Sequence, residues 1–594
     1  MNTIKNTIGI ILAAVIITQV SCNDDAFLEE NPSTFYTIDN VFSTSEQVDQ
    51  VLISIYKHIR DITVNPDETG WILTLRGRGT DMYDVANIRM GNTFSDYSVI
   101  NTTNSTFYEA YCTWYYVIAR SNLALYAAEL PQITWASESN KAYAIAQARF
   151  FRAFAYKNLG QLFGGVPIVT EIATVPRYDY ERATRVETYQ FAIDEMLAIV
   201  NDLPETTNAG GRLVRAAAQH NLSELYLSMG TQLAADGKTT EAQSAFTSSI
   251  NYANQVIDGG RYELIKARFG TRKDEQSFFF TVYENGIESA PVDTIQAIPN
   301  YYWDLFQEGN VNYQDGNTEC IWAMQINYEA YKKEDTKSRL YYTRVYSSIL
   351  RDLPYVLFAG MMEDIGGRGV CQVNITMYAR DEIYAGDFAA DMRNSEAVFR
   401  RRFKANVSTS PYYLQVVPWD VIYGSNDEAN YMNNLSSVYP ISCKISTDKF
   451  TGLADGENRS SLFRDEYMIR LSETILLRAE AKQRNGDKAG AAADINLLRD
   501  RAQCAYRVTA ADMDDNFDMI LDERARELVY EEWRWNTLLR MGGTIAVDRI
   551  RKHAFWPVTA STLTFNYNLW PIPQTVIDTN ADILLPQNPG WENR

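Results

Sequence analysis

Two stretches of the sequence constrain the fold most strongly, because each contains a pair of apolar-faced helices joined by a short polar turn. The first pair spans Arg215 to Met229 and Thr240 to Ile257, and the second spans Tyr467 to Gln483 and Ala489 to Ala502. In both pairs, alanines stand among the larger apolar residues of the facing surfaces, which allows two helices to approach closely. The turn of the second pair is Asn485-Gly486-Asp487. Such pairs predict antiparallel helical hairpins.

Both pairs resemble the tetratricopeptide-type hairpin, whose period is about 34 residues. Two further pairs are predicted, Ser45 to Arg60 with Phe107 to Glu129, and Lys141 to Leu162 with Val186 to Asp202. The sequence therefore predicts a mainly α fold. Its core is a tetratricopeptide-like scaffold of about four helix pairs.

The middle of the chain, residues 265–460, does not follow the helical pattern. It contains several prolines, glycine clusters and aromatic-rich stretches such as Phe278 to Tyr283, which favour short strands, loops and brief helices. We interpret it as a large irregular insertion in one domain that spans residues 43–594. The helical scaffold then covers residues 43–260 and 460–545, and a C-terminal segment covers residues 546–594.

The N-terminus carries a short secretory segment that ends at a cysteine. The apolar run from Ile8 to Val20 is too short to cross a bilayer, which takes about 20 helical residues, so residues 1–21 are interpreted as a signal peptide. The sequence before Cys22 resembles a bacterial lipobox, although Gln19 stands where leucine is usual. The resemblance implies an acylated Cys22 followed by a tether over residues 22–42. The alternative is a plain secreted protein with an incidental cysteine.

The composition limits the classes of partner. Of the 594 residues 46% are hydrophobic, which supports a substantial core. The net charge of −20 argues against nucleic acid and anionic membrane surfaces, since both require a basic protein surface. The 38 tyrosines and 11 tryptophans supply amphipathic rings that suit interfaces and the flat faces of carbohydrates. We therefore expect a neutral ligand or another protein as the partner.

Motifs for catalysis, metal binding and cofactor binding are missing from the sequence. The five cysteines after Cys22 form no Cys-x-x-Cys pair, and His58, His220 and His553 form no His-Glu-x-x-His arrangement. The sequence also lacks a Gly-x-Ser-x-Gly nucleophile elbow and a Gly-rich phosphate loop. We interpret the histidines as structural, and predict no cofactor and no metal site.

Three stretches resemble the SusD/RagB family of surface glycan-binding lipoproteins. They are residues 148–167 (from Ala148-Arg149-Phe150 to Gly165-Val166-Pro167), residues 523–542 (from Glu523-Arg524-Ala525 to Arg540 and Gly542) and residues 570–591 (from Trp570-Pro571-Ile572 to Pro589-Gly590-Trp591). With the tether and the last helix pair, the resemblance covers nearly the whole chain. It departs from the family at Glu532, where glycine is common, and at Trp591, where tyrosine is usual.

The family resemblance implies both a function and a place in the cell. Such proteins capture oligosaccharides without cleaving them and deliver them to a SusC-type TonB-dependent outer-membrane transporter, as part of polysaccharide utilisation. The protein would be lipid-anchored in the outer membrane and would face the cell exterior. Asp24 and Asp25, which follow Cys22, resemble the export tag of such lipoproteins. A periplasm-facing location is the alternative.

A neutral oligosaccharide requires exposed aromatic platforms flanked by polar side chains, each net hydrogen bond contributing about 0.5 to 1.5 kcal/mol. In the resembling family, such aromatics lie in the loops after the first helix and in the insertion. We predict Trp71, Trp303 and Trp322 as platforms, and Asp81 and Asn87 as hydroxyl partners. A place in the core is the alternative for each. The same loops contribute further candidates, namely Tyr83, Asp84, Tyr301 and Tyr302.

Two other functions remain open. The same scaffold could bind oligopeptides, in which case a groove with unpaired strand edges would replace the aromatic platforms. A surface glycoside hydrolase would need two carboxyl groups about 5 to 9.5 Å apart across a cleft. No local motif recommends such a pair among the 75 acidic residues.

The stretch from Leu521 to Leu539 predicts one continuous helix. On it, Glu523 stands three positions before Arg526, and Glu531 stands three positions before Arg534. Opposite charges at this spacing pair along one helical face. Mixed charges usually form a solvated or ion-paired face, so we expect these residues to support the fold and not to act in catalysis.

Overall fold

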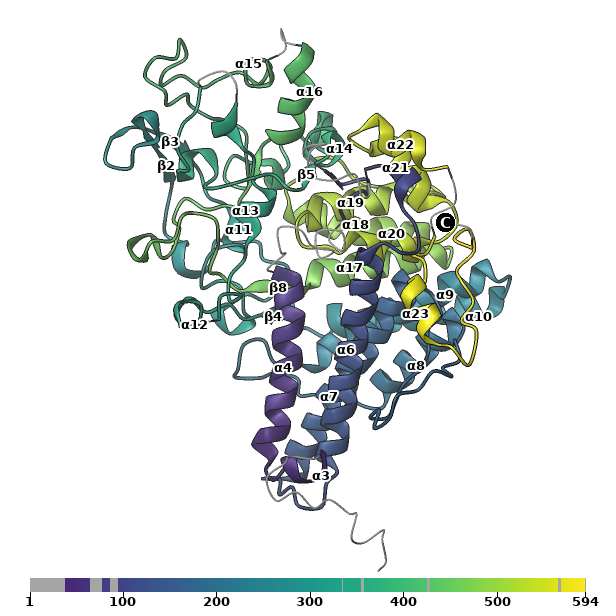
Figure 1. Cartoon of the computed structure of the whole chain (residues 1–594). Coiled ribbons are helices and arrows are strands. Elements are labelled where there is room, and N and C mark those ends of the chain that lie inside the picture. Colours follow the sequence, from purple (N-terminus) through teal and green to yellow (C-terminus); the bar gives the residue numbers. More distant parts are fainter. Residues whose placement is uncertain are drawn as a thin grey trace, which may run out of the picture.

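The structure is a computed structural model that describes residues 38–64, 77–85, 95–333, 335–353, 357–424, 428–564 and 568–592 (Figure 1). Helices make up most of the regular structure. Within these residues the strands are short and pair only two at a time. The prediction of a mainly α fold with a few short strands is confirmed.

The predicted N-terminal features lie outside the described residues. Residues 1–21, Cys22 and the tether up to residue 37 therefore stay predictions. The last residues of the tether contain a short helix, α3 (Ile38–Val41). Among the described helices, none combines the length and the apolar character that crossing a membrane requires.

Eight long helices form the scaffold. They are α4 (Ser45–Val64), α6 (Ser105–Ala128), α7 (Glu138–Leu162), α8 (Arg185–Leu197), α9 (Arg215–Ala235), α10 (Thr239–Ile257), α17 (Leu471–Arg484) and α18 (Lys488–Arg501). Each predicted pair packs together: α4 with α6, α7 with α8, α9 with α10, and α17 with α18. Helix α17 also packs on α10, so the helical array continues across the insertion that separates them in sequence (Figure 1).

Small residues allow a close helix contact between α9 and α10. A Cβ atom placed on Gly230 would lie 2.6 Å from the ring of Phe246, which is shorter than any normal contact. Ala218 and Ala242 are buried in the same pair of helices. The alanine and glycine positions that predicted a hairpin therefore also determine how closely its helices approach.

The predicted helix that begins at Tyr467 starts later in the structure. Tyr467 lies in strand β8 (Glu466–Arg470), which pairs antiparallel with β4 (Cys320–Met324) of the insertion. The prediction is wrong over these residues because a strand from the insertion, distant in sequence, supplies the backbone partners. This pairing connects the insertion directly to the start of α17.

The predicted helix from Leu521 to Leu539 is two helices, α19 (Asp518–Leu528) and α20 (Arg534–Met541). The chain turns between them at Tyr530, whose φ of 63° lies in the left-handed region. The Tyr530 backbone N–H donates a hydrogen bond to the Tyr83 hydroxyl at 2.6 Å. A tertiary contact thus supports a backbone conformation that local helix propensity does not predict.

Most charged residues of α19 and α20 are buried, with Asp518 and Asp522 partly exposed. The predicted pair of Glu523 and Arg526 is present at 3.3 Å. The predicted pair of Glu531 and Arg534 is wrong, because the break between the helices moves Arg534 away. Glu531 instead forms an ion pair with Arg470 at 3.0 Å.

The insertion is irregular, as predicted. Three antiparallel strand pairs lie there or at its edge: β1 (Tyr83–Asp84) with β5 (Asn374–Ile375), β2 (Phe278–Tyr283) with β3 (Pro291–Ala297), and β6 (Phe399–Arg400) with β7 (Ile441–Ser442). Its short helices are α11 (Tyr301–Asp304), α12 (Tyr328–Lys332), α13 (Tyr342–Tyr346), α14 (Met377–Arg380), α15 (Trp419–Tyr423) and α16 (Glu428–Ser437). The insertion has apolar clusters of its own beside the scaffold core.

The C-terminal segment returns to the scaffold. It contains α21 (Ile545–His553), α22 (Pro557–Thr562) and α23 (Gln574–Thr579). The rings of Trp570 and Trp591 are buried, with centroids 5.3 and 5.8 Å from that of Phe107 on α6. These contacts attach the C-terminal segment to α6.

Candidate functional site

The structure places Asp81 and Tyr83 in the interior. Asp81 is fully buried and accepts hydrogen bonds from Arg534 at 2.8 and 2.5 Å. Burial alone would raise the pKa of Asp81, but the Arg534 guanidinium outweighs this effect and holds the pKa well below its usual range. Tyr83 is 3% exposed, and its hydroxyl accepts the Tyr530 hydrogen bond. The prediction that these two residues contact a ligand is wrong, because their polar groups are already engaged inside the protein.

Trp71 and Asn87 lie outside the described residues, so their roles stay predictions. Asp84 lies between them in sequence and is fully buried. It accepts hydrogen bonds from the Val85 backbone at 2.8 Å and from the Ser95 hydroxyl at 3.0 Å. Burial raises the pKa of Asp84 to about 6. Asp84 is therefore a core carboxyl group.

Trp322 lies in the core of the scaffold. It is 2% exposed, and its ring centroid lies 5.7, 6.2 and 5.8 Å from those of three phenylalanines on α7, namely Phe150, Phe151 and Phe154. Its indole N–H donates to the Gly211 carbonyl at 3.0 Å. The prediction of a platform at Trp322 is wrong, because strand β4 directs this ring into the helical array.

Trp303 is also buried, at 2% exposure, but it lines a cavity. One face of its ring stacks on Phe278, with centroids 4.7 Å apart and planes 21° apart. The Arg272 guanidinium lies 4.5 Å from the Trp303 ring centroid. Trp303 is therefore not the exposed platform that was predicted, because its ring is covered from two directions. It forms the floor of a cavity.

Tyr301 and Tyr302 flank Trp303 on α11 but do not line this cavity. The Tyr301 hydroxyl donates to the Arg501 carbonyl at 2.7 Å, and the Tyr302 hydroxyl donates to the Glu527 carbonyl at 2.9 Å. Both hydroxyls therefore connect α11 to the scaffold. The helical turn of α11 directs both side chains away from the cavity that Trp303 lines, and their contact with a ligand stays a prediction.

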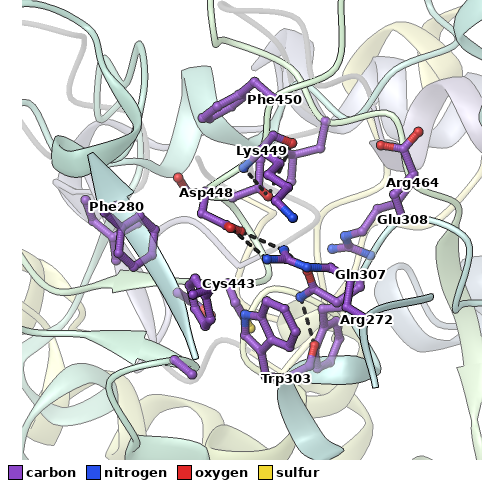
Figure 2. A pocket seen from close by; sticks show the side chains of 18 of the residues that line it. Arg272, Phe280, Trp303, Gln307, Glu308, Cys443, Asp448, Lys449, Phe450 and Arg464 are labelled. Carbon is purple, nitrogen blue, oxygen red and sulfur yellow. Dashed lines mark hydrogen bonds and ion pairs between the residues drawn. The ribbon is translucent and has the colours of Figure 1, made fainter. Parts of the chain in front are cut away.

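The cavity has a volume of about 220 Å³ and lies within the insertion (Figure 2). Six aromatic side chains contribute to its walls: Phe278, Phe280, Trp303, Phe306, Phe450 and Phe463. Polar side chains share the lining, among them Gln307, Glu308, Ser446, Thr447, Lys449 and Thr451. Apolar walls with a few convergent polar groups are the usual composition of a ligand site.

An ion pair crosses the middle of the cavity. Figure 2 shows Arg272 between Trp303 and Asp448, with both nitrogens of its fork directed at the carboxylate. The two hydrogen bonds are each 2.8 Å long. Arg272 also pairs with Glu275 at 2.7 Å. Burial lowers the pKa of Arg272, but the carboxylates of Asp448 and Glu275 outweigh this effect and raise it well above its usual range.

The rim of the cavity adds groups that can bind a polar ligand. Gln307 donates to the Trp303 carbonyl at 2.9 Å, and Glu308 accepts from the Thr451 hydroxyl at 2.7 Å. Lys449 is exposed beside Phe450. Together they offer amide, carboxylate, hydroxyl and ammonium groups around an aromatic floor, which suits a hydroxylated ligand.

The sequence analysis found Trp303 but missed most of this lining. Arg272 and Asp448 stand 176 positions apart along the chain, and no spacing pattern connects them. The one available signal is local: the run Ser446-Thr447-Asp448-Lys449 is polar and lies in an otherwise apolar, aromatic region. Such a run predicts a loop, but it does not indicate which side chains it faces.

A second cavity of about 510 Å³ lies on the scaffold. It is formed by α6, by the extended residues 167–180 and by α23. The rings of Tyr111 and Tyr115 stack there, with centroids 4.9 Å apart, and Tyr108 is 41% exposed. This tyrosine groove is larger than the insertion cavity, and its lining carries fewer charged side chains.

The described residues offer few groups that could bind a metal ion or act in acid–base catalysis. Within the part of the chain that the structure describes, no three His, Cys, Asp or Glu residues are grouped so that they could hold a metal ion. His220 is buried and hydrogen-bonded to Thr474 at 2.8 Å, and burial lowers its pKa to about 3. His58 and His553 pack on the rings of Tyr116 and Tyr378. All three histidines occupy structural positions.

Comparison with known proteins finds two family models that match this chain. Residues 318–591 match the model of the SusD family, and residues 26–227 match a family described as starch-binding and associating with the outer membrane. SusD-like protein P2 of Formosa agariphila is 22% identical over 97% of this chain and 98% of its own length. The starch-binding protein SusD of Bacteroides thetaiotaomicron is 30% identical over 165 residues, so the chain spans only 28% of that relative.

Solved structures show the same fold along almost the whole chain. A SusD homolog from Bacteroides thetaiotaomicron has a TM-score of 0.65 at 17% identity, covering 93% of this chain and 98% of that one. A laminarin-binding SusD-like protein has a TM-score of 0.60 at 18% identity, covering 93% of this chain and 100% of that one. At these identities the similarity establishes the fold.

Proposed function

We propose that this chain, which belongs to the SusD/RagB family, binds oligosaccharides at the cell surface. Proteins of this family bind ligands without catalysis, so the chain is not an enzyme. The ligand class is inferred from the relatives: one is a starch-binding protein, and one structural neighbour is a laminarin-binding protein.

The observation that carries the proposal is the insertion cavity. Its aromatic walls can pack on the C–H faces of a sugar ring, as Tyr and Trp do in amphipathic contacts. Gln307, Thr451 and Lys449 line the same space and can bond to hydroxyl groups. Aromatic surfaces and hydrogen-bonding groups therefore meet in one place, on the irregular part of a rigid helical scaffold.

The location and the partner form the second part of the proposal. The matching family description associates its members with the outer membrane. We infer that acylation of Cys22 anchors the protein there, that it faces the exterior, and that it delivers its ligand to a SusC-type TonB-dependent transporter. The lipobox-like segment and the acidic residues Asp24 and Asp25 support this arrangement.

The ligand class is tested by isothermal titration of a soluble form that begins at Asn23. Oligosaccharides and oligopeptides are titrated separately, and the mixtures are assayed for new reducing ends. Binding of an oligosaccharide without cleavage is the expected result. Peptide binding alone would support the oligopeptide alternative, and new reducing ends would support a hydrolase.

Two variants locate the site. Phe450→Ala removes an aromatic wall of the insertion cavity and should weaken oligosaccharide binding at least tenfold. Tyr108→Ala removes an aromatic from the tyrosine groove and serves as the matched control, since it should leave the affinity unchanged. The reverse pattern would move the site to the groove on the scaffold.

The anchor and the orientation need a test in cells. Replacing Cys22 by alanine should release the protein from the outer-membrane fraction. Protease added to intact cells should degrade the wild-type protein if it faces outward. Crosslinking followed by purification should recover a TonB-dependent transporter, and recovery of the protein alone would contradict the delivery step.

A further inference from the structure

Arg400 is a buried arginine of the insertion cavity whose hydrogen bonding is incomplete. It lines the insertion cavity from strand β6 and is 3% exposed. Its Nη1 donates to the Glu363 carbonyl at 2.8 Å, while its Nε and Nη2 have no hydrogen-bond partner. Buried charged groups are normally paired, because an unpaired charge in a protein interior costs free energy.

The other buried arginines differ from Arg400 in this respect. Across the described ranges, each of them forms an ion pair with an aspartate or a glutamate, and Arg400 forms none. Arg501, for example, is fully buried and pairs with Glu319 at 2.8 Å. Among the described residues, the buried arginine without a carboxylate partner therefore lies at the cavity.

The two unpartnered nitrogens of Arg400 have the geometry that a carboxylate requires, and both are buried, so a ligand reaches them when the side chains that cover them move. Nε and Nη2 form one edge of the guanidinium plane, and their parallel N–H groups match the two oxygens of a carboxylate. The guanidinium carbon lies 3.9 Å from the Phe280 ring centroid and 5.1 Å from that of Phe403. These rings hold the plane in place. Burial lowers the pKa of Arg400 to about 10, so the group is still charged at neutral pH.

Asp364 does not take the open edge, although its charge acts on Arg400 more than that of any other carboxylate. Asp364 is 1% exposed, and neither of its carboxylate oxygens has a hydrogen-bond partner. Burial raises the pKa of Asp364 to about 7 in spite of Arg400. No hydrogen bond therefore joins the Asp364 carboxylate to the Arg400 guanidinium.

The other cations of the lining have carboxylate partners. Asp448 is neutralised by Arg272, which leaves Glu308 as the acidic group. Arg464 lines the cavity at 4% exposure and has an unpartnered Nε, although its Nη1 pairs with Glu466 at 2.9 Å. Lys449 pairs with Glu275 at 3.1 Å, so among the described residues Arg400 is the cation of the lining that has no carboxylate partner.

We infer that the insertion cavity binds an acidic sugar, whose carboxylate pairs with the Nε and Nη2 edge of Arg400. This inference rests on the proposed function and specifies its ligand as a uronic-acid-containing oligosaccharide. It differs from the neutral ligand that the composition predicted. The cavity is smaller than the about 300 to 1,000 Å³ of sites for drug-sized ligands, so it holds a single acidic residue of a longer chain.

The test compares oligosaccharides that differ only at the carboxyl group. Uronate oligosaccharides are titrated beside their carboxyl-reduced counterparts, which have the same linkages and no charge. A sulfated oligosaccharide and its desulfated form make a second pair. We expect the uronate to bind at least about tenfold more tightly than its reduced form, and to lose affinity as the salt concentration rises.

Variants connect this preference to the cavity. Arg400→Met should abolish the preference for the uronate, and circular dichroism checks that the variant folds. Lys449→Gln changes an exposed residue and should reduce the preference without a risk to folding. Lys488→Gln on α18 is the matched control and should have no effect, because Lys488 is another surface lysine with one carboxylate partner, Asp515.

Each other outcome has a separate meaning. Equal or tighter binding of the reduced oligosaccharide would overturn the inference and leave the proposed function intact. Binding of the sulfated form alone would overturn the assignment of a carboxylate. If no oligosaccharide bound, the proposed function itself would fail, and the inference with it.

Discussion

Buried arginines are used in two different ways in this molecule. Where the insertion meets the scaffold, Arg470 and Arg501 share the carboxylate of Glu527, and both also pair with Glu319. In the insertion cavity, Arg400 is as deeply buried but has no carboxylate partner within the described residues. Burying a guanidinium costs free energy in both regions. Only in the first region do carboxylates of the same chain offset this cost.

The difference separates a structural role from a binding role. A buried ion pair that is complete within the chain fixes how two parts of the fold meet. A buried cation whose hydrogen-bonding edge is open is unfavourable until a ligand arrives, so it marks a site. Residue type and burial alone do not distinguish the two cases. The hydrogen-bond and ion-pair partners of the arginine distinguish them.

The largest expected effect comes from breaking the complete network at Glu527. This carboxylate is fully buried and accepts hydrogen bonds from Arg393 at 3.1 Å, from Arg470 at 2.7 Å and from Arg501. Glu527→Ala leaves these cations without their shared partner, and should lower the free energy of unfolding by about 3 to 5 kcal/mol. Urea denaturation followed by circular dichroism measures the change.

A surface carboxylate provides the control for this change. Glu308→Ala removes an exposed group and should alter the free energy of unfolding by no more than about 0.5 kcal/mol. A similar small change in Glu527→Ala would mean that the network does not stabilise the junction of the insertion and the scaffold. The buried ion pairs of Arg470 and Arg501 would then have no stabilising role.

The next effect concerns the carboxyl group beside Arg400. Burial raises the pKa of Asp364 to about 7, above its value of about 3.9 in an unfolded chain. The group therefore contributes its stability fully below about pH 4, and this contribution is lost as the pH rises through 7. Asp364→Asn cannot ionise, so its stability relative to the wild type should increase by about 2 to 4 kcal/mol between pH 4 and pH 8.

Denaturation curves at several pH values test this sign. The asparagine loses no hydrogen bond of the carboxylate, because neither oxygen of Asp364 has a partner. If the free energy of unfolding changed with pH in the same way for the variant and the wild type, Asp364 would be ionised and paired. In that case Arg400 would have its carboxylate within the chain, and the reason to expect an acidic ligand would disappear.

The helical pairs could be predicted from the sequence because their determinants are local. Apolar residues at helical spacing, alanines on the facing surfaces and polar turns identified α9, α10, α17 and α18 with few errors at their ends. Errors arose where distant residues determine the backbone. Strand β8 needs its partner β4, and the turn at Tyr530 needs the Tyr83 hydroxyl.

The candidate site was harder to predict for the same reason. The sequence identified Trp303 and Trp322 equally, but strand β4 directs Trp322 toward α7, whereas α11 places Trp303 beside Arg272. Asp81 was predicted to be a ligand residue, and its actual partner Arg534 stands 453 positions away. The exposure of a single side chain depends on such distant neighbours, and no periodic pattern encodes them.

A smaller effect is expected from removing the unpaired cation itself. Arg400→Met replaces a buried charge by an apolar side chain of similar length, and Asp364 can then remain protonated. The free energy of unfolding at pH 7 should stay the same or rise by about 1 kcal/mol. Arg501→Met is the matched control, since it removes an equally buried but paired arginine, and it should be destabilised by about 3 kcal/mol. Equal losses in both variants would show that the two arginines have the same role.

The smallest effect is expected at the rim of the cavity. The Lys449 side chain is 66% exposed and pairs with Glu275 at 3.1 Å, and exposed ion pairs contribute little because water and salt screen them. Lys449→Gln should therefore change the free energy of unfolding by less than about 0.5 kcal/mol. Because stability is unaffected, any loss of uronate affinity in this variant reports on charge alone. A loss of stability above about 1 kcal/mol would instead mean that Lys449 holds the rim in shape, and its effect on binding could not be separated from that of folding.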